Sequence, residues 1–467
     1  MRSRITLAAA ATILSVSGTA FSNGRYPAAS QIVVDPNDPN HVVVAATFGF
    51  LDSRDGAKSF NWLCEQAVGV AGEEGFDIVL AVTGNGNTVL GLFNGMATTR
   101  DGCTFQMPSE LSNQVIGDIS WRRSTPNYVI GFTLANLVGG FASQIVQSND
   151  DGATWSPVGP QLPTSLLPLT IDLGPNTANR VYISARADRT KNFISVLMRS
   201  DDGGMTFQTS DILGTEQQRL AYIAAVHPTQ PDRVYLRSLD DKDGVPITVI
   251  YMTADGGQTF QKIFTGTDQL FGFAISPDGT EIAFGGPGDG LYVGAADGTN
   301  LARRSDLQPT SLTWTPQGLY AAADSKVAGF SIGRSLDSGA TFQGLFKYDS
   351  ICGKTACSSK ATSACAAQWE LIAPQLGVTC SAPDGGGADA GTDAKPGGGP
   401  ADVSGGTGGT SGTSGTGGTS TGESSGGCVV SHARSSSHAP TWFARLFTVG
   451  IGAALLWRRH RRAQIEN

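Results

Sequence analysis

The chain has 467 residues, of which 61 are glycine and only 15% are charged. This length and composition suit one large domain of short strands and turns, with low-complexity sequence added to it. Removing the two arginines of the first 22 residues and the net +5 that follows Cys428 from the overall −8 leaves about −15 on residues 23–428. So acidic a domain has no basic footprint, which argues against nucleic acid and anionic membrane surfaces as its partners.

The first 22 residues are predicted to be an export signal rather than part of the fold. Arg2 and Arg4 form a basic start, Ile5–Leu14 is an apolar stretch, and Ala20–Ser22 is a small-residue cleavage site. A short buried strand or helix is the alternative interpretation, but it does not account for the order of these three parts. We therefore expect the mature chain to be exported.

An eight-residue turn motif recurs through the body of the chain, and its clearest copy reads S-x-D-x-G-x-T-W. The Ser or Thr hydroxyl and the Asp carboxylate can accept backbone N–H bonds in a tight turn, and glycine can take a left-handed backbone there. The final aromatic ring buries a large apolar surface. Four full copies, one with its glycine a residue early and one shortened copy contain, respectively, Ser148, Asp150, Gly152 and Trp155; Ser200, Asp202, Gly204 and Phe207; Thr253, Asp255, Gly257 and Phe260; Ser335, Asp337, Gly339 and Phe342; Ser53, Asp55 and Phe60; and Asp101 and Phe105.

A strand, a turn that usually contains proline, and a second strand form a hairpin start that occurs seven times. The turn motifs begin at residues 53, 99, 148, 200, 253 and 335, so the last interval holds two units, and a plain turn near Leu291–Thr299 replaces the missing motif. Seven units of about 46 residues fit the four-stranded blades of a β-propeller. The sequence therefore predicts an all-β fold, a seven-bladed β-propeller over residues 23–348, with no strand exchange between the first and last blades.

The turn motif resembles the Asp-box (BNR) repeat of sialidases and sortilin-like proteins. The resemblance implies a structural turn between the two outer strands of each blade, away from the central site. A sialidase needs three arginines that clamp the substrate carboxylate, a tyrosine nucleophile activated by glutamate, and an aspartate as acid/base. Arg25 stands near the place of the family's first arginine, although Gly24 and Tyr26 depart from the family's aromatic-R-I-P phrase. Arg186 and Arg237 follow the second strands of units four and five and are the other candidate ligand-binding residues.

Simpler interpretations compete with each of these candidates. Arg186 is equally consistent with a loop cation beside Asp188, and Arg237 with a partner of Asp240. No Glu–Tyr pair stands where the nucleophile belongs, and Tyr320 is typical of a core residue. We therefore predict a monomeric, non-catalytic binding module for an extracellular glycan or protein, with a sialidase-like exo-glycosidase as the alternative. No cofactor or metal is expected, since the five histidines are scattered and the motif aspartates serve their own turns.

The cysteines predict disulfides in an oxidising compartment. We expect Cys64 to pair with Cys103, because both lie at neighbouring turn motifs. The four cysteines of residues 349–380 are expected to pair among themselves in a small Cys-rich cap, in which Ser363–Leu371 is the predicted helical turn: Cys352, Cys357, Cys365 and Cys380. Zinc is the alternative for these four, but they lack the paired C-x2-C spacing of zinc sites.

The rest of the chain predicts a tether and a sorting signal. Residues 381–427 are rich in Gly, Ser and Thr, which predicts a disordered linker. Cys428, the apolar stretch Trp442–Trp457 and the arginine cluster at 458–462 together resemble the myxobacterial sorting tail (MYXO-CTERM). This resemblance implies cleavage near Cys428 by a sorting protease and retention at the surface or outer membrane of a Gram-negative bacterium. A longer spacer and Arg445 depart from the pattern, and an ordinary C-terminal membrane anchor is the alternative.

Overall fold

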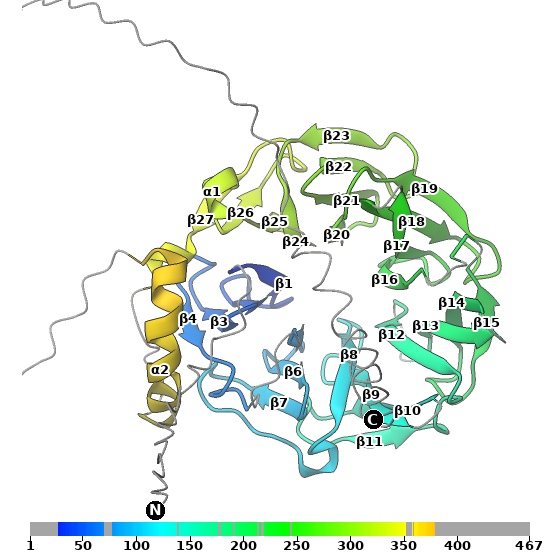
Figure 1. Cartoon of the computed structure of the whole chain (residues 1–467), viewed down its shortest axis with the longest axis horizontal. Coiled ribbons are helices and arrows are strands. Elements are labelled where there is room, and N and C mark those ends of the chain that lie inside the picture. Colours follow the sequence, from blue (N-terminus) through cyan, green and yellow to red (C-terminus); the bar gives the residue numbers. More distant parts are fainter. Residues whose placement is uncertain are drawn as a thin grey trace, which may run out of the picture. The chain divides into compact units, whose positions relative to one another are not determined.

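The computed structural model describes residues 27–69, 77–137, 140–175, 179–189, 192–212, 214–215, 219–242, 245–351, 357 and 359–378. The strands of these residues form seven antiparallel sheets in a ring, so the predicted seven-bladed β-propeller is confirmed (Figure 1). The predicted export signal, Arg25, the linker, Cys428 and the sorting tail lie outside the described residues. Within the described residues, no helix is both long and apolar enough to cross a membrane.

Each blade is built from consecutive strands, ordered from the centre of the ring to its rim (Figure 1). The blades are, in chain order, β1 (Ala29–Val34), β2 (Val42–Ala46), β3 (Gly49–Ser53) and β4 (Asn61–Leu63); β5 (Val79–Val82), β6 (Thr88–Leu92) and β7 (Gly95–Thr99); β8 (Val115–Trp121), β9 (Val129–Leu137), β10 (Gly140–Ser148) and β11 (Ser156–Val158); β12 (Leu166–Leu173), β13 (Val181–Arg189), β14 (Asn192–Ser200) and β15 (Gln208–Asp211); β16 (Ala221–Val226), β17 (Val234–Lys242), β18 (Val245–Thr253) and β19 (Gln261–Thr265); β20 (Gly272–Ile275), β21 (Glu281–Gly286), β22 (Gly290–Ala295) and β23 (Ala302–Ser305); β24 (Pro309–Thr315), β25 (Gly318–Ala323), β26 (Ile332–Ser335) and β27 (Gln343–Phe346).

The second blade differs from its neighbours in its outer edge. Its shortened turn motif is followed by a single bridge between Thr98 and Gln106, which takes the place of a fourth strand. The described part of the chain also contains four short helical segments outside the blades: η1 (Ser109–Leu111), α1 (Ser325–Ala328), η2 (Tyr348–Ser350) and α2 (Ser359–Leu376).

The repeated motif forms the same hydrogen-bonded turn between the third and fourth strands of its blades. Ser148 Oγ donates to Asp150 Oδ1 (2.7 Å) and accepts the N–H of Gly152 (2.8 Å). The N–H and hydroxyl of Thr154 donate to the two Asp150 carboxylate oxygens at 2.9 and 2.6 Å. Matching bonds occur in the turns that begin at Ser53, Ser200, Thr253 and Ser335, and we call all of these the repeat turns.

A repeat turn joins its blade to the blade before it. Trp155 of the third blade is buried against Val89 and Met96 of the second, and its ring N–H donates to the Gly152 carbonyl. Gly152 itself faces Val89 and Thr98 so closely that a Cβ would lie 3.0 and 2.7 Å from their methyl groups. Phe207, Phe260 and Phe342 pack against the preceding blade in the same way. The aromatic ring and the glycine of the motif therefore serve the contact between blades.

The ring closes between the seventh and first blades without strand exchange, as predicted. The N–H of Ile32 on β1 donates to Ser311 Oγ on β24 at 3.2 Å. Tyr320, Ile332 and Phe346 of the seventh blade share one buried cluster with Ile32 and other residues of the first. Closure therefore depends on packing between sheet faces, and disulfides to the C-terminal segment add covalent links.

The C-terminal segment contains α2, which follows the seventh blade in the chain and lies along β4 of the first (Figure 1). Trp369 of α2 packs on Trp62 with ring centroids 5.4 Å apart, and Ile372 and Leu376 join the same buried cluster. The helix is twice as long as the predicted Ser363–Leu371 segment, at 18 residues. We call α2 together with Cys357 the C-terminal clasp.

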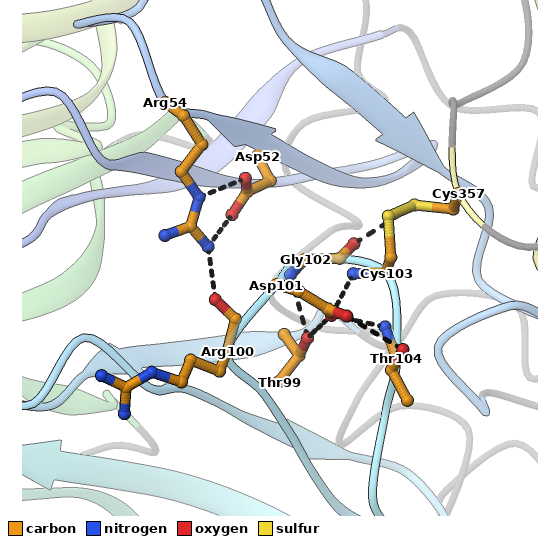
Figure 2. Close-up of a disulfide and its surroundings, with 9 residues drawn as sticks. All are labelled: Asp52, Arg54, Thr99, Arg100, Asp101, Gly102, Cys103, Thr104 and Cys357. Atoms are coloured by element: carbon orange, nitrogen blue, oxygen red, sulfur yellow. Dashed lines mark hydrogen bonds and ion pairs between the residues drawn. A yellow bond between two sulfur atoms is a disulfide. The ribbon is translucent and has the colours of Figure 1, made fainter.

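The predicted disulfide pairing is wrong. Cys64 bonds to Cys365 of α2, across 301 residues, and Cys103 bonds to Cys357, across 254. Cys64 follows β4, where α2 lies, whereas Cys103 belongs to the shortened turn motif of the next blade, so the clasp reaches each of them separately. Figure 2 shows the second bond beside Asp101, whose carboxylate accepts the N–H groups of Cys103 and Thr104. Cys352 and Cys380 lie outside the described residues.

Candidate functional site

Around the centre of the ring, several backbone N–H groups of the innermost strands donate hydrogen bonds to side chains of the neighbouring blade. Five of the innermost strands carry a β-bulge, and in four of them a polar residue after the bulge reaches the innermost strand of the next blade. Gln31 accepts the N–H of Leu80, Asp118 that of Ile171, Thr170 that of Ile223, and Ser311 that of Ile32. These four side chains join blades and are not free to hold a ligand.

Three charged side chains, Asp118, Asp172 and Arg122, lie close together where the innermost strands of the third and fourth blades meet. Burial raises the pKa of Asp118 to about 7, and the nearby Asp172 carboxylate adds to the increase. Burial also raises the pKa of Asp172, which accepts a hydrogen bond from Ser120 Oγ at 2.8 Å. Arg122 is only 8% exposed, and its three guanidinium nitrogens have no hydrogen-bond partner within the described part of the chain. Its pKa is lowered to about 10 by the same burial.

The structure brings the two predicted arginine clamps to the same tyrosine. Tyr222 on β16 stands directly opposite Arg237 on β17, and the charges of Arg237 and Arg186 both act on it. Arg237 donates through Nη1 to the carbonyl oxygens of Leu270 (2.9 Å) and Phe271 (2.6 Å). Arg186 stacks on the ring of Phe193 at 4.1 Å. Both guanidinium groups thus have partners within the protein.

The protonation of Tyr222 is opposite to what a nucleophile requires. An attacking tyrosine needs a lowered pKa or an adjacent base. Burial instead raises the pKa of Tyr222 to about 12, although the positive charges of Arg237 and Arg186 act in the opposite direction. Asp240, which the sequence offered as a partner of Arg237, forms an ion pair with Arg219 at 2.6 Å. Tyr320 is buried, as predicted for a core residue.

The repeat-turn aspartates are also occupied. Hydrogen bonds, chiefly from the Thr206 hydroxyl, lower the pKa of Asp202 to about 2, so it stays ionised while both oxygens accept bonds from its own turn. Among the residues that the structure describes, no group of three or more His, Cys, Asp or Glu side chains is placed to hold a metal ion.

Two polar hollows open on the face that carries the repeat turns. One of about 470 Å³ lies between the first and second blades and includes Arg54 and Arg100. Arg54 is bound to Asp52 (2.9 Å) and to the carbonyl of Arg100 (2.8 Å), as Figure 2 shows. The other, which we call the 3–4 pocket, has about 460 Å³ and lies between the third and fourth blades; its lining residues are Thr125, Asn127, Tyr128, Gln147, Asn149, Val158, Asn179, Asp202, Gly203 and Met205.

Sequence reasoning missed the 3–4 pocket, although one signal was available. Met205 is 52% exposed, and the same place in three other repeat turns is held by Ala153, Gln258 and Ala340. A large apolar side chain that one turn exposes and its siblings lack is a candidate contact residue. The amides around it became recognisable as a group only once the two blades were placed side by side.

No family model and no curated protein matches this sequence. Among solved structures, an ancestral GH74 enzyme aligns with 68% of this chain and 46% of its own, at 16% identity and a TM-score of 0.50. YCF48, solved with a D1 peptide bound, aligns over 57% and 79% at 17% identity and a TM-score of 0.37. Saccharomyces cerevisiae Sqt1 aligns over 69% and 85% at 9% identity and a TM-score of 0.41. The chain spans less than half of the GH74 enzyme, and at 16% identity the likeness to that enzyme supports the fold alone.

Proposed function

We propose that this protein is an exported, surface-held β-propeller that binds an extracellular glycan or protein without catalysis. The observation that supports this most is the state of Arg186, Arg237 and Tyr222. Two carbonyl oxygens hold Arg237, an aromatic ring holds Arg186, and the tyrosine between their charges has a raised pKa. A group of residues already paired within the fold is suited to structure rather than to nucleophilic attack.

The repeat turns, in this proposal, are Asp boxes of the sialidase and sortilin-like type. Their hydroxyl, carboxylate and glycine are used within the turn, and their aromatic ring is used between blades. The box therefore supplies the fold of the binding module and leaves recognition to residues around it. The sequence of Cys428, apolar stretch and arginine cluster supports retention at the cell surface by a sorting tail.

A sialidase-like exo-glycosidase is the second candidate, because two arginines and a half-buried tyrosine do meet near the centre of the ring. Hydrolysis of a chromogenic sialoside by the purified protein distinguishes the two. We expect no turnover from the wild type. Turnover that is lost in Arg25→Ala and Arg186→Ala but kept in Arg304→Ala, an exposed arginine on β23, would establish the enzyme instead.

Binding and display need their own experiments. Arrays of extracellular glycans and proteins probed with the wild type should give saturable binding to at least one ligand class. For display, antibody labelling of intact cells should detect the propeller, and Cys428→Ser should change the fraction kept on the surface. Equal labelling of wild type and Cys428→Ser would contradict the sorting-tail part of the proposal and leave the binding module untouched.

A further inference from the structure

We propose that the 3–4 pocket is the binding site for a neutral, hydroxyl-rich sugar unit, an inference that rests on the proposed binding function. The pocket lies between two blades on the repeat-turn face, with a volume of about 460 Å³. Pockets that hold small ligands in proteins typically measure ~300–1,000 Å³. The hollow is therefore large enough for one or two sugar rings and too small for a folded partner to enter.

The chemistry of the wall favours hydroxyl groups. Four side-chain amides line the pocket, those of Asn127, Gln147, Asn149 and Asn179. The Asn127 amide donates to the Asn149 carbonyl and the Gln147 amide accepts from the Tyr128 hydroxyl, and each keeps further donor and acceptor positions. An amide offers both a donor and an acceptor, and a sugar hydroxyl does the same, so the two kinds of group pair in either direction. The apolar wall is confined to Val158, Met205 and the Tyr128 ring, which leaves little to receive the apolar side chains of a peptide.

The charge at the pocket favours a neutral ligand over an acidic one. No lysine or arginine is among its lining residues, and its one acid, Asp202, stays ionised because its own turn stabilises the carboxylate. The carboxylate of a sialic or uronic acid would meet this negative charge without a cation on the wall to pair with. Arg122 lies close enough to act on Tyr128, but it is buried and also interacts with Asp172.

The test compares variants whose new residues already occur in sibling turns. Asn149→Ala introduces the residue of the fifth-blade turn at that place, Ala254, and Met205→Ala introduces that of Ala153 and Ala340. Gln258→Ala is the matched control, because Ala153 and Ala340 hold that place elsewhere. The probes are immobilised neutral oligosaccharides (glucans, galactans and mannans) beside sialylated and uronic-acid oligosaccharides, measured with the full-length protein.

We expect saturable binding of at least one neutral oligosaccharide, equal in the wild type and Gln258→Ala. Loss of one hydrogen bond is worth about 1 kcal/mol, or about fivefold in Kd. Met205→Ala also removes an apolar contact, so Asn149→Ala with Met205→Ala together should weaken binding about tenfold or more. A neutral ligand should bind within about twofold between 50 and 500 mM salt, since screening acts on charges.

Three results would overturn the assignment. One is binding confined to acidic oligosaccharides, and another is neutral binding that is unchanged in the double variant. The third is absence of any oligosaccharide binding. If the protein array gives a ligand in that third case, the propeller remains a binding module and only the sugar site is lost. If sialoside turnover is found instead, the proposed function itself fails.

Discussion

Gly152 and Gly204 occupy the same place in two repeat turns, yet their surroundings predict different costs for an added methyl group. Both have a left-handed backbone, with φ of +86° and +97°. An alanine there costs about 1–2 kcal/mol, offset by about 0.4–1 kcal/mol from a less flexible unfolded chain. At Gly152 a Cβ would also lie 2.7 Å from Thr98 Cγ2, whereas at Gly204 its nearest neighbour is Val158 Cγ1 at 3.4 Å. Crowding of a packed contact adds about 1–3 kcal/mol at Gly152 alone.

We therefore expect Gly204→Ala to lower the free energy of unfolding by about 0–1.5 kcal/mol and Gly152→Ala by about 1–4 kcal/mol. Urea denaturation followed by tryptophan fluorescence measures both, and the m value shows whether the folded and unfolded states stay comparable. Equal losses in the two variants would mean that close contact with the second blade is not what requires glycine at residue 152. A larger loss in Gly204→Ala would contradict the packing argument altogether.

Three further predictions test other joints of the ring. Trp155→Ala should cost ~3–5 kcal/mol, as for other buried aromatic rings, and an unchanged denaturation midpoint would show that its packing contributes nothing. Cys365→Ser should cost about 2–5 kcal/mol, because the disulfide that it removes restricts a very long loop of the unfolded chain, and peptide mapping that finds Cys64 bonded to Cys103 in the wild type would refute the pairing. Burial raises the pKa of Asp118 to about 7, so the folded carboxyl holds its proton more tightly than an unfolded one of pKa ~3.9. The stability that this tighter proton binding contributes is complete below about pH 4 and is lost as the pH rises through 7. Between pH 4 and 8 the free energy of unfolding of Asp118→Asn should therefore rise relative to wild type, and parallel pH profiles would refute the shift.

The blades could be predicted from sequence because each repeats the same local physics. The Ser–Asp–Gly turn is closed within eight residues, and its aromatic ring follows at a fixed spacing, so the number of units could be counted. The missing copy near Leu291–Thr299 is a plain turn in the structure, where Asp297 accepts two bonds from Thr299. Local hydrogen bonds leave a local signature, and such signatures survive in a single sequence.

The C-terminal clasp was predicted only in part, because its partners are far away in the chain. The six cysteines before Cys428 indicated disulfides, but the spacing of Cys64 and Cys103 says nothing of a helix that returns from residue 359. A signal did exist, since Cys365, Trp369, Ile372 and Leu376 recur at steps of four, three and four residues, which is typical of one buried helix face. This spacing predicts the helix. It does not predict which blade the helix packs against, because that contact exists only once the ring has closed.

The candidate sites depend on the ring in the same way. The sequence placed Arg186 and Arg237 on neighbouring blades, but both lie within the second strands, β13 and β17, and not after them. It did not indicate the carbonyl oxygens of Leu270 and Phe271 that hold Arg237. The 3–4 pocket is formed by residues from two blades that have no shared motif. Its ligand, like the assignment of the two arginines, stays a prediction until binding is measured.

The C-terminal clasp also changes what a protease can do to this molecule. The bond between Cys64 and Cys365 spans nearly all of the ring, so a single backbone cut anywhere from residue 65 to 364 leaves both pieces covalently joined. The bond between Cys103 and Cys357 gives the same protection a second time for cuts in the third to seventh blades. A nicked propeller would keep all seven blades in one covalently joined molecule. On a gel it would run as one band until its disulfides are reduced. For a protein proposed to work outside the cell, loop cleavage and loss of the domain become separate events.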